Sequence, residues 1–230
     1  MQQIFRLHQV ALRRGMHRLL LSGSNFGARF RRRQIFRNVF VAITEVPDEF
    51  LQGGVGDLDG TPIPAHQWYR LVTSGFIHFG LFHIAMNMLL LFQLGALLER
   101  ALGAVKLTAM YFASLLAGSL GVLLVGGAAL TGGASGAVFG LMAGAAVGLH
   151  RRGVNVFSTG IGTTLLLNLV LTFSISGISI GGHVGGAIGG AICGFVMLAP
   201  GWKPMPKWAG YAAPAAVALV ALVASVIVVG

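Results

Sequence analysis

The chain contains few acidic residues and almost no cysteine. Its 230 residues include 6 Asp and Glu against 16 Lys and Arg, with a single cysteine, Cys193. One cysteine excludes an internal disulfide framework and a metal site built from cysteines. After residue 50 the acidic residues reduce to Asp57, Asp59 and Glu99. A site built from two carboxylates deep in the apolar part of the chain is therefore excluded as well.

Formal charge is absent from three long tracts, residues 107–150, 153–202 and 208–230, in a chain that is 55% hydrophobic. A helix needs about 20 apolar residues to cross a bilayer, so the first two tracts each predict a helical hairpin and the third a single span. The stretch 75–98 is long enough for one more. We predict an all-α, polytopic helical membrane bundle with spans at 76–98, 107–128, 134–150, 154–174, 180–199 and 208–229.

The cations between these spans lie in alternate turns, at Arg100, Lys106, Arg151, Arg152, Lys203 and Lys207. The positive-inside bias predicts that these turns are cytoplasmic and that the C-terminus is outside. We divide the chain into a basic N-terminal segment (1–44), an outer loop (45–75) and a transmembrane domain (76–230). The expected location is a multi-pass position in a bacterial plasma membrane, with the lipid bilayer as a partner.

The first 44 residues hold nine arginines and no acidic residue, and they contain no run of 18 apolar residues. A basic run of this kind indicates a cytoplasmic or membrane-surface segment, or a nucleic-acid patch. Because a membrane domain follows, we expect no nucleic-acid partner. The basic segment therefore contains no apolar helix that could cross the membrane between a cytoplasmic N-terminus and the outer loop.

Polar residues gather in the outer half of the predicted bundle. His83 and Asn87 lie in the outer half of the first span, Ser135 opens the third span and His183 opens the fifth. Glycines recur every four residues along the third and fifth spans, a spacing that lets helix backbones approach closely. Packing alone explains such stripes. If the two stripes face each other, Ser135 and His183 come within hydrogen-bond reach.

A serine hydroxyl becomes a nucleophile at neutral pH when an imidazole can take its proton. His83 and Asn87 are four residues apart, hence on one helix face, and both can donate hydrogen bonds to a developing oxyanion. The backbone N–H of Ser135, near a helix N-terminus, would add a third donor. A polar clamp between helices is the alternative for His83 and Asn87.

Other hydrolytic chemistries lack their residues in this chain. A zinc hydrolase would need a His-Glu-x-x-His helix, which is absent. No acidic residue lies where it could complete a Ser-His-Asp triad. We therefore expect a Ser–His dyad in which another group orients the imidazole, with no metal and no cofactor.

Together these residues resemble the rhomboid family of intramembrane serine proteases, from about Trp68 to Pro200. The G-x-S-G motif of that family reads Gly133-Ala134-Ser135-Gly136, its H-x-x-x-N motif reads His83-Ile84-Ala85-Met86-Asn87, and its histidine helix reads His183-Val184-Gly185-Gly186 with Gly190 following. The resemblance implies a rhomboid-like fold in which Ser135 is the nucleophile and His183 the general base.

The resemblance also implies supporting roles. His83, Asn87 and the Gly133 segment would form the oxyanion and substrate site, and Gly186 and Gly190 would support the histidine helix. Arg70 corresponds to a structural anchor in the outer loop. Phe139 stands where many members have a tyrosine, so its ring can pack on His183 without the hydroxyl contact.

The first helix of the family is not readable here, and His183 falls on the fifth recognisable span where the family has it on the sixth. The expectation is a seven-span member whose N-terminal sequence reflects a displaced reading frame or start. Substrates would be transmembrane proteins cleaved near the outer face; the oligomeric state is left open. Two alternatives remain: a catalytically inactive relative that binds and escorts membrane proteins, and a small-molecule transporter, which would show inverted repeats and helices broken at mid-membrane.

Overall fold

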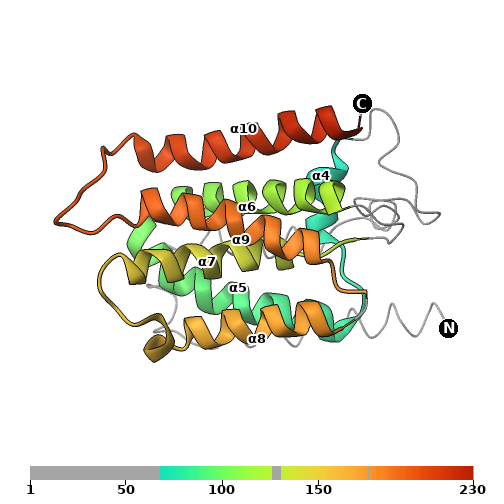
Figure 1. Ribbon diagram of the computed structural model, residues 1–230, viewed down its shortest axis with the longest axis horizontal. Helices are drawn as coiled ribbons and strands as arrows, with labels where there is room; N and C mark the ends of the chain where they lie inside the picture. Colours follow the sequence, from blue (N-terminus) through green and yellow to red (C-terminus); the bar gives the residue numbers. More distant parts are fainter. Residues whose placement is uncertain (1–67, 126–130, 176, 230) are drawn as a thin grey trace, which may run out of the picture. The chain divides into compact units, whose positions relative to one another are not determined.

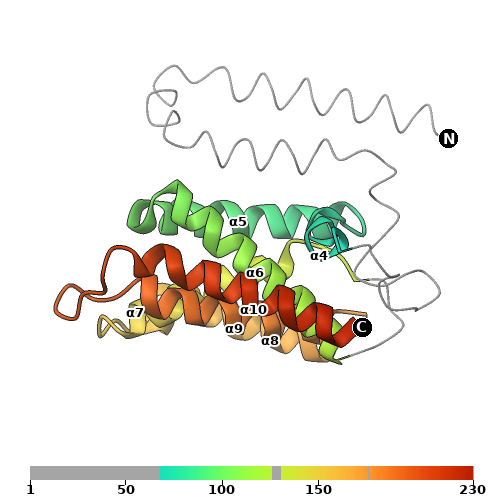
Figure 2. The same cartoon turned by 90° about the horizontal axis from the view of Figure 1, so that it is seen from above.

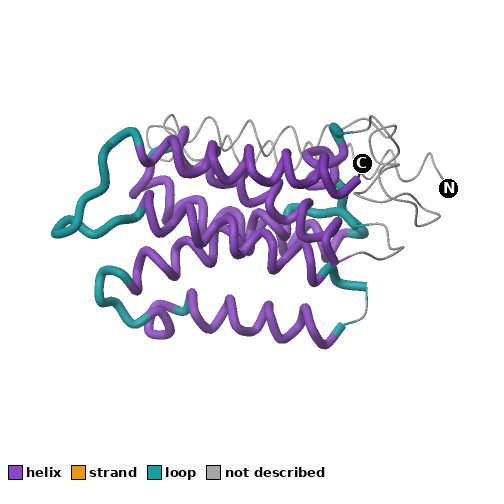
Figure 3. Tube along the Cα trace, turned by 45° about the horizontal axis from the view of Figure 1, so that its top comes forward, coloured by secondary structure: helices purple, strands orange, loops and turns teal. Residues whose placement is uncertain are grey.

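A computed structural model describes residues 68–125, 131–175 and 177–229, and the regular structure in these ranges is helical (Figure 1; Figure 3). The predicted all-α fold is confirmed. The predictions for residues 1–44 and for most of the outer loop, 45–67, lie outside the described residues. The elements are α4 (Arg70–Thr73), η3 (Ser74–Phe76), α5 (Leu81–Leu102), α6 (Ala104–Val125), α7 (Ser135–His150), η4 (Val156–Thr159), α8 (Ile161–Ser174), α9 (Ile180–Met197) and α10 (Ala209–Val229).

Helices α5 to α10 correspond in order to the predicted spans, but they differ in length. By length and composition, α5, α6, α9 and α10 are able to cross a membrane, whereas α7 has 16 residues and α8 has 14. At 1.5 Å per residue these two helices are only about 24 and 21 Å long, shorter than a hydrocarbon core of about 30 Å. The predicted span 154–174 is divided into η4 and α8 at Gly160, which lies between the two elements and has a φ of 78°. Neither short helix could cross such a core on its own as a straight helix.

The glycine stripes of α7 and α9 face each other. A Cβ atom added at Gly186 would overlap the backbone of Gly136, and one added at Gly190 would overlap the backbone of Gly140. Only glycine permits backbones to pack this closely, and close packing provides the contact energy between helices when lipid surrounds both. The two helices that carry Ser135 and His183 are thus in direct backbone contact.

A second glycine face of α9, which the sequence interpretation did not identify, packs on α6. A Cβ at Gly181 would overlap the Gly121 carbonyl, and one at Gly185 would overlap the Ala117 carbonyl. Helix α9 therefore has one glycine face on α7 and another on α6, and the three helices run beside one another in Figures 1 and 2. Backbone contact on two sides leaves α9 little freedom to shift or rotate.

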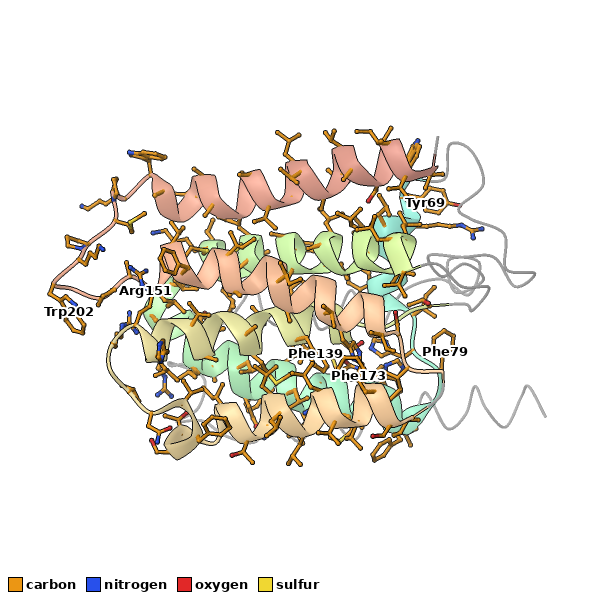
Figure 4. All side chains as sticks on the ribbon, viewed as in Figure 1. Tyr69, Phe79, Phe139, Arg151, Phe173 and Trp202 are labelled. Atoms are coloured by element: carbon orange, nitrogen blue, oxygen red, sulfur yellow. The ribbon has the colours of Figure 1, made fainter. Side chains whose placement is uncertain are left out.

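The two ends of the helix bundle differ in chemistry. Figure 4 shows Arg151 and Trp202 at one end and Tyr69 and Phe79 at the other. The Arg151 guanidinium lies over the Phe195 ring at 3.9 Å and donates a hydrogen bond to the Phe195 carbonyl. The turns rich in cations lie at the Arg151 end of the bundle, as the alternating direction of successive helices predicts. Their assignment to the cytoplasm stays a prediction.

Helix α10 follows the histidine-bearing helix and packs on both α6 and α9. At its start the Lys106 ammonium of α6 lies 4.8 Å from the centre of the Tyr211 ring. Further along, Ala221 joins Leu71 and Leu116 in a buried apolar cluster. The additional helix is thus attached to the same helix, α6, that supports α9.

Candidate active site

Ser135 is the first residue of α7, and the turn before it is held in place by glycine. Gly133 has a φ of 121°, a conformation that favours glycine, and its N–H donates to the Ser74 carbonyl at 2.8 Å. Ala134 occupies the N-cap position and makes no side-chain cap hydrogen bond. The first amide groups of an α-helix have no partner within the helix, so this N-terminus presents backbone donors beside the serine hydroxyl.

His183 lies in the first turn of α9, which Ser179 caps. The Ser179 hydroxyl accepts a hydrogen bond from the Gly182 N–H at 3.1 Å, and the His183 N–H donates to the Ser179 carbonyl at 3.2 Å. A serine N-cap of this kind stabilises a helix start by about 1 kcal/mol. The cap therefore fixes the point on α9 from which the imidazole projects.

The structure brings the two side chains together, with His183 Nε2 2.8 Å from Ser135 Oγ. Phe139, one turn after Ser135 on α7, stacks on the imidazole with ring centres 4.1 Å apart and an angle of 16° between the planes. Figure 4 shows Phe139 toward the Tyr69 end of the bundle. His183 is 8% exposed and the serine is half-buried. This arrangement places an imidazole nitrogen within proton-transfer distance of a hydroxyl while limiting contact with solvent.

The second nitrogen of the imidazole is held by a residue that the sequence interpretation missed. Thr172 Oγ1, on α8, lies 2.7 Å from His183 Nδ1, and the same hydroxyl donates to the Asn168 carbonyl at 2.7 Å. Thr172 is 2% exposed. No motif marks this threonine. Only its position in the sequence could have indicated it. Because the connection from α8 to α9 is a few residues long, the end of α8 must lie beside the start of α9, where His183 is.

His83 faces the turn that leads into Ser135. Its Nδ1 accepts the Phe79 N–H at 3.3 Å, so in the neutral ring the proton is on Nε2. A Cβ atom at Gly133 would lie 2.8 Å from that Nε2. The Asn87 amide donates one of its two N–H groups to the His83 carbonyl at 2.9 Å. The His83 Nε2–H donor thus lies against the Gly133 turn, whereas the observed Asn87 bond stays within α5.

Three further candidate residues, Arg70, Gly186 and Gly190, lie on α4 and α9. Arg70 is buried in α4, and its Nε and Nη1 atoms have no hydrogen-bond partner among the described residues. Gly186 and Gly190 lie in the contact with α7 on the helix that carries His183. Within the described ranges, no group of three or more His, Cys, Asp or Glu side chains is arranged to hold a metal ion.

Comparison with known proteins matches the Rhomboid domain to residues 65–200 of this chain. Over 132 residues it is 32% identical to Rhomboid protease GluP of Bacillus subtilis, covering 56% of this chain and 26% of the relative. Rhomboid-type serine protease 2 of Emericella nidulans is 38% identical over 92 residues, 38% of this chain and 18% of the relative. RHOMBOID-like protein 1 of Arabidopsis thaliana is 42% identical over 77 residues, 34% of this chain and 20% of the relative.

The fold and the site define a multi-pass, all-helical integral membrane protein with a buried histidine paired to a half-buried serine near one end of its bundle. The chain belongs to the rhomboid family. The matches span about a quarter or less of the length of these relatives. Since the relatives come from a bacterium, a plant and a fungus, they do not support the expected bacterial plasma membrane in particular.

Proposed function

We propose that this protein is an intramembrane serine endopeptidase that cleaves transmembrane protein substrates near the outer membrane face. The observation that supports the proposal most directly is the 2.8 Å contact between Ser135 Oγ and His183 Nε2. A hydroxyl paired with an imidazole at this distance is the arrangement that activates a serine for nucleophilic attack. The relatives named as proteases support the same activity.

The proposed reaction begins with proton transfer from Ser135 Oγ to His183 Nε2. The oxygen forms a bond to the substrate carbonyl carbon, and the carbonyl electron pair moves onto its oxygen. The protonated imidazole then gives its proton to the leaving amine as the peptide bond breaks. A water molecule, activated by the same imidazole, releases the acyl group and restores Ser135.

The oxyanion site would lie between α5 and the start of α7. His83 Nε2–H lies against the Gly133 turn, and the backbone N–H of Ser135 is at a helix N-terminus without a side-chain cap. Donors fixed before the reaction stabilise the developing negative charge without having to reorganise. We propose that Asn87, whose amide retains a second N–H group, adds to this set.

The site is suited to substrates within the membrane. Ser135 and His183 are in the first turns of α7 and α9, near one end of an apolar bundle, and the short α7 allows its N-terminus to start below the level reached by the long spans. A transmembrane substrate with a locally unwound helix could present its backbone there. We propose that Arg70 anchors the loop segment beside this end and that Gly186 and Gly190 hold α9 at the required distance.

Cleavage of a model transmembrane substrate by the full chain in proteoliposomes tests the proposal. Wild type should cleave it and be labelled by a fluorophosphonate probe, and Ser135→Ala and His183→Ala should do neither. Exposed Thr163, on the far part of α8, provides a matched control as Thr163→Val. Substrate binding without cleavage by a folded wild type would instead identify an inactive binding factor, the alternative left by the sequence.

A further inference from the structure

The structure assigns a positioning role to Thr172: we propose that its hydroxyl selects the imidazole tautomer in which His183 Nε2 can accept the Ser135 proton. The catalytic role of Thr172 rests on the proposed function, whereas the contact between Thr172 and His183 does not depend on it. Thr172 is on α8, whereas the two dyad residues are on α7 and α9. The proposal therefore connects a third helix to the chemistry of the pair.

The direction of the two Thr172 hydrogen bonds follows from the single proton of its hydroxyl. A hydroxyl has one proton to donate and two lone pairs that accept. The Thr172 proton is donated to the Asn168 carbonyl at 2.7 Å, one turn earlier on α8. Toward His183 Nδ1, also 2.7 Å away, the same oxygen then only accepts. Nδ1 must accordingly carry the imidazole proton.

The consequence appears at the other ring nitrogen. In a neutral imidazole one nitrogen carries the proton and the other has a lone pair. With the proton on Nδ1, the lone pair of Nε2 points at Ser135 Oγ, 2.8 Å away, and can accept its proton. In the opposite tautomer Nε2–H would donate to the serine oxygen, and the ring could not act as a base.

The surroundings of His183 show why a neutral hydroxyl takes this place. Among the described residues the only acidic side chain is Glu99, which lies near the C-terminal end of α5, whereas His83 lies in the first turn of that helix. Phe139 covers a face of the ring, and Thr172 is 2% exposed, so bulk water has little access to Nδ1. In this setting a hydroxyl orients the ring without adding a buried negative charge, whose desolvation is costly.

The contact can be tested without any substrate. In full-length protein labelled with ¹⁵N-histidine in bicelles, the His183 signals, identified by their loss in His183→Gln, should report a proton on Nδ1 and a bare Nε2. Thr172→Val keeps the shape of the side chain and removes the hydroxyl, so it should produce a mixture of tautomers. A wild-type ring protonated on Nε2, or a Thr172→Val spectrum identical to wild type, would overturn the proposal.

Kinetics provide the second test. Leaving a buried N–H without its acceptor should lower kcat of Thr172→Val by roughly ten- to a hundredfold, with little change in KM. Thr172→Ser keeps the hydroxyl and should recover most of kcat, whereas a purely structural role for the methyl group would impair Thr172→Ser and spare Thr172→Val, which keeps that methyl. The matched control Thr163→Val, the same change at an exposed threonine of the same helix, should behave like wild type.

The two proposals fail in different ways. If wild type does not cleave the substrate, the proposed function fails, and the tautomer measured by NMR still decides the role of Thr172. If wild type cleaves, Ser135→Ala does not, and Thr172→Val keeps the wild-type kcat, the protease stands and the role of Thr172 is overturned.

Discussion

Replacing Gly186 with alanine tests whether backbone contact between α7 and α9 sets the geometry of the dyad. The added Cβ atom would lie 2.6 Å from the carbonyl carbon of Gly136, the residue that follows Ser135. Carbon atoms in contact are normally about 3.5–4.0 Å apart. Since the obstacle is backbone rather than a side chain that can rotate, the two helices must separate by about 1 Å.

Two effects of opposite sign act on stability. Alanine is a better helix former than glycine by about 1 kcal/mol, so helix propensity alone predicts a more stable protein. Overpacking costs about 1–3 kcal/mol, and a clash with backbone belongs at the upper end of that range. We expect Gly186→Ala to be less stable by about 2 kcal/mol.

The effect on activity should be larger than the effect on stability. A separation of about 1 Å would lengthen the 2.8 Å contact between His183 Nε2 and Ser135 Oγ beyond hydrogen-bond distance. Misplacement of this size can cost about 10²-fold in rate. Cleavage rate and thermal unfolding of the detergent-solubilised protein measure the two effects.

Gly201→Ala serves as the control, because a Cβ atom there would meet nothing within 4 Å and the residue does not have a positive φ. It should match wild type in both assays. A Gly186→Ala protein that is more stable than wild type and fully active would refute the reasoning. Helix propensity would then outweigh overpacking, and the close approach of the helices would not control the geometry of the dyad.

Two further predictions concern the residues around His83. Asn87→Ala should lower kcat on the order of 10²–10³-fold if the amide stabilises the oxyanion, and a change confined to KM would contradict that role. His78 precedes the α5 span, and its burial, followed by repulsion from His83, lowers its pKa from 6.5 to about 4. Between these values the unfolded chain binds a proton that the folded one does not, so stability falls as pH drops from 6.5 to about 4. His78→Gln should lose less thermal stability than wild type between about pH 7 and about pH 4, and equal losses would refute the assignment to His78.

Much of the fold follows from patterns that act locally along the chain. Charge-free tracts predicted the helices because burying a formal charge in hydrocarbon is costly. Alternation then placed Ser135, His183 and the His83 helix toward one end, because each turn reverses the direction of the chain. Helix lengths were less predictable. The start of α5 at Leu81 depends on Gly80, with a φ of 97°, and not on hydropathy.

The sequence by itself determined the membrane class and the helix order, and it placed Ser135 and His183 at the starts of two parallel helices. Charge-free tracts and the alternating direction of successive helices encode these features directly. Only the tertiary structure decided the contacts that depend on distances between helices. It brought His183 Nε2 to Ser135 Oγ, packed a second glycine face of α9 on α6, and placed Thr172 against His183 Nδ1. A hydrogen bond between helices depends on their separation and rotation, which no local pattern in the sequence specifies.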